Sequence, residues 1–199
     1  MPQTRLILDH VLDHAEQHPD RVYLTQPLGG GRVADYTWAQ VLDQARRMAA
    51  HLQQRGFEPG ARIAILSKNC AHFIMAELAI WMAGHTTVAI FPTETAETVR
   101  FVLEHSGASL LFVGKLDTWP QQQPGVPAEL PCIALPLAPK TEFETWDAIT
   151  ARTPPLPGRP SSAAPESGAS ATVSNRPTAH SSARRRRSCG RSPPSSSPP

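Results

Sequence analysis

Residues 57–114 read FEPGARIAILSKNCAHFIMAELAIWMAGHTTVAIFPTETAETVRFVLEHSGASLLFVG. A continuous apolar run at 61–67 suits a strand that is buried on both faces, and similar runs follow at 86–91 and 109–114. Between these runs, residues 70–83 and 95–107 carry the patterns of helices. Strand, helix, strand, helix, strand in this order predicts βαβ units in a parallel sheet with helices on both faces. The predicted fold class is therefore α/β.

The flanking sequence predicts further elements of the same unit. Residues 37–56 form the clearest helix, because Thr37 and Gln40 have the spacing of a capping box and Gly56 can end the helix. Residues 5–18 place apolar side chains on one helical stripe, and 130–135 suit a fourth, shorter strand. We expect Asn69 to cap the helix 70–83 and Thr95 to cap the next one.

A glycine-rich turn lies near the N-terminus. Residues 21–27 read as a strand, GGGR (29–32) as a turn, and the residues after it as the start of a return strand. No helical pattern follows the glycines directly, so we interpret them as a flexible hairpin turn rather than a phosphate-binding loop.

The composition changes sharply near residue 155. Residues 160–199 contain 12 Ser, 7 Pro, 6 Arg and 6 Ala, with Val173 as the only large aliphatic residue and no aromatic one. Such a segment cannot bury enough apolar surface to offset its ordering entropy, so we expect a disordered tail over 151–199 after a domain over 1–150. Six arginines and one glutamate give 160–199 a charge of +5, which leaves −3 for residues 1–159.

Three cysteines, Cys70, Cys132 and Cys189, are far apart, and no Cys/His spacing indicates a zinc site or a disulfide framework. The N-terminus lacks the long apolar run of a signal peptide, and the most apolar stretch, 71–84, is too short to span a bilayer. We therefore expect free thiols, no transmembrane segment and a cytoplasmic location.

Three histidines recur on one helix face, at positions 10, 14 and 18. A metal site is one interpretation of this spacing, but the third ligand lies two turns from the first and no carboxylate or cysteine completes the set. A solvated helix face is favoured.

The other candidate residues each have a simpler structural interpretation. Ser67, Lys68 and Asn69 follow a strand at the edge where α/β sheets bind ligands, yet helix capping and solvation explain them. Cys70 at a helix start is favoured as a packing residue over a reactive thiol. His85 and His105 suit helix ends, and Glu97 and Glu104 suit a solvated face. No catalytic, cofactor-binding or metal-binding residue is nominated.

Five segments together resemble the N-terminal subdomain of the AMP-forming (adenylate-forming) acyl-CoA synthetases, most closely the long-chain fatty-acid branch. They are AEQHPDRVYL (15–24), YTWAQV (36–41), PGARIAILSKN (59–69), AIWMAGHTTVAIFPT (79–93) and VRFVLEHSGASLLFVGKLD (99–117). The resemblance covers residues 5–150. Ala89 departs from the family, which commonly has proline there.

The resemblance implies a two-step reaction. A fatty acid and ATP form an acyl-adenylate and pyrophosphate, with Mg²⁺ offsetting phosphate charge, and coenzyme A then displaces AMP. The family binds the phosphates with a loop of the form YTSGSTGxPKG, which these 199 residues do not contain; ESGASATVSNRP (166–177) lacks the lysine that should follow. We therefore expect a truncated synthetase that is inactive alone and holds no cofactor of its own.

Two alternatives concern the tail. A non-catalytic binding or regulatory protein could use Arg184 to Arg187 on nucleic acid or an acidic partner, but the tail has no aromatic residue to stack on bases, so nucleic acid is disfavoured. The tail also has the composition that results when a GC-rich coding region is translated in the wrong reading frame. A frameshift is therefore the second alternative. A missing strand would leave an open sheet edge that promotes aggregation or chaperone binding.

Overall fold

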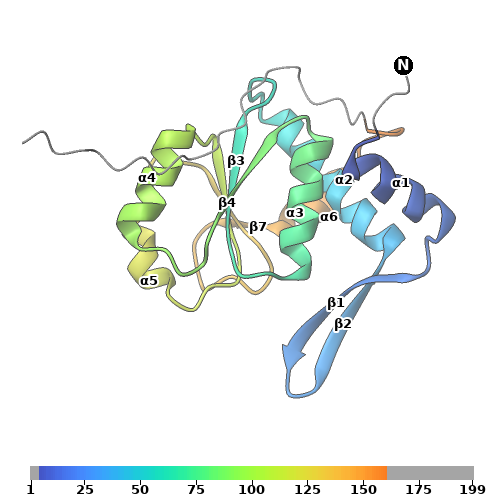
Figure 1. The fold of residues 1–199 in the computed structure, drawn as a ribbon, viewed down its shortest axis with the longest axis horizontal. Coiled ribbons are helices and arrows are strands. Elements are labelled where there is room, and N and C mark those ends of the chain that lie inside the picture. Colours follow the sequence, from blue (N-terminus) through green and yellow to red (C-terminus); the bar gives the residue numbers. More distant parts are fainter. Residues whose placement is uncertain (1–4, 161–199) are drawn as a thin grey trace, which may run out of the picture. The chain divides into compact units, whose positions relative to one another are not determined.

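The computed structural model describes residues 5–160, which are built around a five-stranded sheet (Figure 1). All its strands are parallel, in the order β4-β3-β5-β6-β7. Their bounds are β3 Arg62–Leu66, β4 Thr86–Ile90, β5 Leu110–Val113, β6 Cys132–Ala134 and β7 Glu144–Thr145. The predicted parallel sheet is confirmed, and β7 is a strand that the sequence pattern did not indicate.

The central strand β3 sets the register of the sheet. Ile65 lies opposite Ala89 of β4 on one side and Phe112 of β5 on the other. Residues 63–66 are fully buried, as expected of a run that is apolar at every position.

Helices cover both faces of the sheet, as predicted (Figure 1). One layer contains α1 (Ile7–Gln17), α2 (Trp38–Gln54), α3 (Ala71–Met82) and α6 (Trp146–Arg152). The other contains α4 (Ala96–Ser106) and the short α5 (Trp119–Gln122), which runs into the 3₁₀ turn η1 (Gln123–Gly125). Alternate strand residues face opposite layers: Ile63 and Ile65 pack in the first, and Leu66 packs in the second.

The expected hairpin is present as β1 (Val22–Gly29) and β2 (Arg32–Thr37). Figure 1 shows it extending away from α1 and α2. Gly30 and Gly31 form its turn with φ of +59° and +74°, a conformation in which glycine carries no steric penalty.

Most predicted helix ends are confirmed. Thr37 Oγ1 accepts a hydrogen bond from the Gln40 N–H, and the Gln40 side chain accepts one from the Thr37 N–H. Thr95 caps α4 in the same way, through the Thr98 N–H. The helix α1 starts later than the predicted range 5–18: Leu6, an apolar residue of that range expected on the stripe, lies before the helix and is 42% exposed.

Helix α6 runs from Trp146 to Arg152, so the expected domain boundary at residue 150 falls inside it. The residues after this helix stay attached to the helical layer. The Leu156 N–H donates to the Arg46 carbonyl at 3.3 Å, and Arg159 pairs with Asp13 and Glu16 of α1 at 2.5 and 3.1 Å. The expected disordered tail starts at residue 151, but residues 151–160 belong to the described structure, with Arg152 still in α6. The rest of that expected tail, residues 161–199, lies outside the described residues. Among residues 5–160, no helix combines the length and hydrophobicity needed to cross a membrane.

Candidate functional site

The carboxyl ends of β3 and β5 meet at the sheet edge where α/β proteins usually bind ligands. Here the Gly114 N–H donates to the Leu66 carbonyl at 3.0 Å, and the Lys68 N–H donates to the Lys115 carbonyl at 2.9 Å. Ser67 lies between them and is 3% exposed. This is the strand end that the sequence singled out, and β5 is the neighbour that completes it.

The Ser67 hydroxyl links the two loops that leave these strands. It donates to the Lys68 carbonyl at 2.7 Å and accepts the Lys115 N–H at 3.0 Å. Gly114 makes room for it, because a Cβ at this position would lie 2.2 Å from Ser67 Oγ and 2.5 Å from Ser67 Cβ. The hydroxyl is therefore engaged in holding the backbone.

An ion pair between Lys68 and Asp117 lies at this edge. The Lys68 ammonium forms an ion pair with Asp117, and its hydrogen bond and charge hold the pKa of that carboxyl below its usual range; Lys115 adds a smaller effect in the same direction. Both partners of the pair are exposed, so the pair contributes little to stability.

The start of α3 differs from the prediction. Cys70, not Asn69, occupies the N-cap position, and its side chain makes no capping hydrogen bond. Instead the Ala71 N–H donates at 2.9 Å to the side-chain oxygen of Gln26, a residue of β1 that is 5% exposed. The cap is thus supplied from 45 residues away, and no local sequence signal could have identified it. The Cys70 sulfur lies 3.9 Å from Ser67 Oγ and is half-buried.

The histidines of α1 contact aromatic rings and one another. His14 stacks on Trp38 with ring centroids 5.6 Å apart, and His18 lies 6.1 Å from His14. His10 is exposed. Among residues 5–160, no group of three or more His, Cys, Asp or Glu is arranged to hold a metal ion.

The remaining candidates are not brought together. His85 packs edge-on against Phe57, and burial lowers its pKa. His105 stacks on Phe101 on α4, where Glu104 pairs with Arg100 at 3.5 Å and Glu97 is exposed. These side chains form no catalytic constellation with the Ser67 edge.

The sequence reasoning missed two buried histidines, His51 and His72. His72 is 4% exposed and lies edge-on to Tyr36 and Trp146, with ring centroids 5.5 and 5.7 Å apart. Burial lowers its pKa, and the negative charge of Asp147 partly opposes that shift. A histidine in an otherwise apolar helix gave no signal of this aromatic environment.

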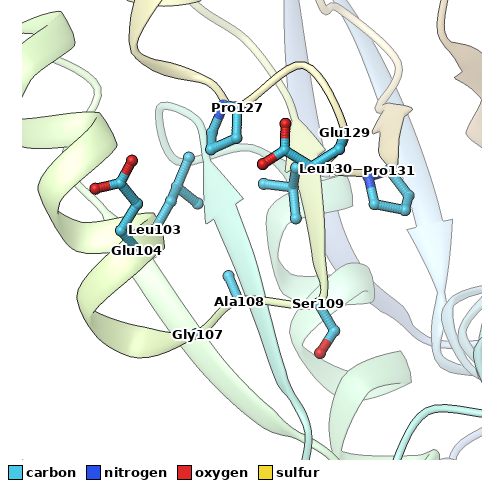
Figure 2. Close-up of a pocket in the computed structure, with 9 residues that line it drawn as sticks. All are labelled: Leu103, Glu104, Gly107, Ala108, Ser109, Pro127, Glu129, Leu130 and Pro131. Atoms are coloured by element: carbon cyan, nitrogen blue, oxygen red, sulfur yellow. The ribbon is translucent and has the colours of Figure 1, made fainter.

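A shallow cavity of about 340 Å³ lies at the opposite, amino-terminal edge of the sheet. Figure 2 shows Leu103 next to Glu104 on one side and Leu130 next to the Glu129 carboxylate on the other, with Ala108 below them. A second hollow, of about 380 Å³, lies between α2 and residues 154–157. The apolar surface and carboxylates of the first cavity do not fit the phosphates of ATP.

Comparison with known proteins places these observations in context. The model of the AMP-binding enzyme family matches residues 11–183. The long-chain-fatty-acid--CoA ligase FadD15 of Mycobacterium bovis is 36% identical over 102 residues, which are 51% of this chain but 17% of that protein.

Two solved structures share the fold. The anthranilate CoA ligase AuaEII, in complex with anthranoyl-AMP, matches with a TM-score of 0.65 and 16% identity, over 77% of this chain and 29% of its own. The acetoacetyl-CoA synthetase of Streptomyces lividans matches with a TM-score of 0.64 and 22% identity, over 73% of this chain and 25% of its own. In each case the match spans less than a third of the longer protein.

Proposed function

Because this chain belongs to the AMP-binding enzyme family, we propose that residues 5–160 are the N-terminal subdomain of an acyl-CoA synthetase that activates long-chain fatty acids. The main support is the parallel order β4-β3-β5-β6-β7 with helices on both faces, a fold shared with two solved CoA ligases. The fatty-acid class is supported by the M. bovis relative.

In this proposal the whole ligase joins a fatty acid to the α-phosphate of ATP, releases pyrophosphate, and transfers the acyl group to the thiol of coenzyme A. Residues 5–160 provide a rigid scaffold for that chemistry. Ser67 and Gly114 hold two strand ends in fixed register, and the Lys68 ammonium beside them is paired with Asp117. We assign no contact with reacting atoms to any of these residues.

We further propose that the 199 residues alone do not catalyse adenylation, because they contain no loop of the form YTSGSTGxPKG to hold the phosphates. The test is fatty-acid-dependent exchange of labelled pyrophosphate into ATP, with palmitate and Mg²⁺ present. We expect no exchange above the protein-free control, while the M. bovis ligase serves as the positive control. Palmitate-dependent exchange by the purified chain would overturn this part of the proposal.

A chimera tests the positive part. Residues 5–160 replace the corresponding stretch of the M. bovis ligase, and palmitate-dependent exchange is measured. We expect exchange to be retained, whereas a host that lacks the stretch altogether should be inactive. A chimera that is soluble and melts cooperatively, yet exchanges no pyrophosphate, would contradict the proposal.

The composition change near residue 155 supports the proposal that a frameshift produced the tail, whose residues beyond 160 lie outside the described part. The test is to translate the coding DNA from codon 155 in its other two frames. One frame should encode an apolar strand followed by a Thr/Ser/Gly-rich loop with lysine. Finding neither feature would mean that the tail is genuine.

The disfavoured alternative, nucleic-acid binding by the basic tail, also has a test. If the arginine run 184–187 binds nucleic acid, deleting residues 161–199 should abolish salt-dependent DNA binding, and equal binding with and without the tail would remove that function.

We also propose a cytoplasmic location, which agrees with Cys70 and Cys132 being free thiols. Fractionation of cells that express the full chain tests it.

A further inference from the structure

The two edges of the parallel sheet differ in how well they are protected. The β7 edge is two residues long; Glu144 forms an ion pair with Arg152, and Thr145 caps α6. The β4 edge is five residues long and has the sequence TTVAI, with neither charge nor proline. Proteins usually blunt exposed edges with short strands, charges or proline, and β4 has none of these features.

Among residues 5–160, no strand pairs with the outer edge of β4. Thr86 donates its N–H to the Ala61 carbonyl on the β3 side. Because backbone groups alternate in direction along a strand, those of Thr87 and Ala89 point away from β3. The Ala89 side chain is exposed, and Phe91, just past the strand, is 75% exposed.

The sequence around this edge carries no charge that would oppose contact between two copies. Residues 78–93 contain no Asp, Glu, Lys or Arg, and His85 is their only ionisable side chain. Burial lowers the pKa of His85, which favours its neutral form. Two such edges can therefore approach each other without like-charge repulsion.

We propose that a second copy of this chain pairs with β4 in antiparallel orientation, with the two-fold axis at Val88. In this register Thr87 of each copy lies opposite Ala89 of the other copy. The outward-pointing N–H and C=O groups of these two residues then form hydrogen bonds with each other across the interface. All five residues of β4 are paired, and the two sheets become one. The inference does not depend on the proposed ligase function.

The test measures the mass of the full 199-residue chain in solution by light scattering after size exclusion. The chain has a mass of 21.6 kDa, and we expect twice that value at micromolar concentration. Ala89→Lys places two ammonium groups on the same face, close to the two-fold axis, and should weaken dimerisation by about tenfold or more. Ala128→Lys, the same change at an exposed loop position, should leave the dimer intact.

Hydrogen exchange on the unmodified chain provides a second measurement that needs no variant. The amides of Thr87 and Ala89 should become protected as concentration rises, and dilution should remove that protection. Any one of three results would overturn the proposal. They are a chain that is monomeric at all concentrations, a dimer that Ala89→Lys does not weaken, and exchange rates of the Thr87 and Ala89 amides that do not change with concentration. If a strand of another protein pairs with β4 instead, the pure chain will be monomeric and will form a complex only with that protein. This result would also overturn the proposal.

Discussion

The indole N–H of Trp146 donates a hydrogen bond to the side-chain oxygen of Gln44 at 3.0 Å, which joins α6 to α2 across 102 residues of chain. Trp146 is fully buried, and its ring lies 6.1 Å from that of Phe112 in the central sheet. Helix α6 is therefore part of the core.

Trp146→Ala should be strongly destabilising. Truncating a fully buried tryptophan typically costs about 3–5 kcal/mol, a large fraction of the stability of a domain. The measurement is urea unfolding followed by circular dichroism. Asp147→Ala, at the exposed neighbouring position, should change the free energy of unfolding by less than about 0.5 kcal/mol. Equal effects of the two changes would show that α6 does not stabilise the core.

Gly114→Ala should destabilise the sheet edge, because the new methyl group meets Ser67 Oγ at 2.2 Å and Leu135 Cδ1 at 3.2 Å. Overpacking of this kind costs about 1–3 kcal/mol. The control is the double variant Ser67→Gly with Gly114→Ala. Its loss in free energy of unfolding should be smaller than the sum of the losses in the two single variants, because Ser67→Gly removes the side chain that clashes. Strict additivity in thermal unfolding would contradict the proposed steric cause.

The sequence predicted those elements whose signals are local. The buried run at 61–67, the Thr37–Gln40 capping box and the Thr95 cap all depend on residues within one element, and the structure confirms them. The strand β7 has two residues, too few for any hydrophobic pattern, and pairs only because β6 lies beside it. The Gln26 cap of α3 could not be predicted either, because donor and acceptor lie in separate elements that only the fold brings together.

The same reasoning explains why the candidate residues remained unassigned. The edge of parallel strands drew attention to Ser67 and Lys68, but their partners, Lys115 and Asp117, come from the next βαβ unit. Those contacts show that the hydroxyl and the ammonium are engaged within the protein. A sequence pattern cannot separate a side chain that awaits a ligand from one that already has a partner.

Gln26→Leu tests the long-range cap of α3. It removes the acceptor for the Ala71 N–H and leaves that donor buried, which should cost about 1–3 kcal/mol. Gln121→Leu, at an exposed position of α5, is the matched control and should be nearly neutral. Hydrogen exchange should show faster exchange of the Ala71 amide in Gln26→Leu only. An unchanged amide would mean that the Gln26 cap does not protect this donor.

Stability should fall as the pH is lowered from about 7.5 to about 5.5, because burial lowers the pKa of His72 in the folded protein. The unfolded chain binds a proton on this imidazole near its ordinary pKa of about 6.5, whereas the native state resists protonation. The stabilisation is therefore fully present above the unfolded pKa and is lost as the pH falls through the folded one. The lowered pKa values of His51 and His85 act in the same direction.

Replacing His72 separates its share of this pH dependence from the others. In His72→Phe the free energy of unfolding should vary less steeply between pH 7.5 and 5.5, because one group that takes up a proton on unfolding is gone. Val41→Ala, a buried apolar truncation of the same core, should lower stability at every pH without changing the slope. The lowered carboxyl pKa values of Asp117 and Glu144 act only at lower pH and do not enter this window. A slope that is identical in His72→Phe and in the unmodified chain would show that His72 is not a source of the acid sensitivity.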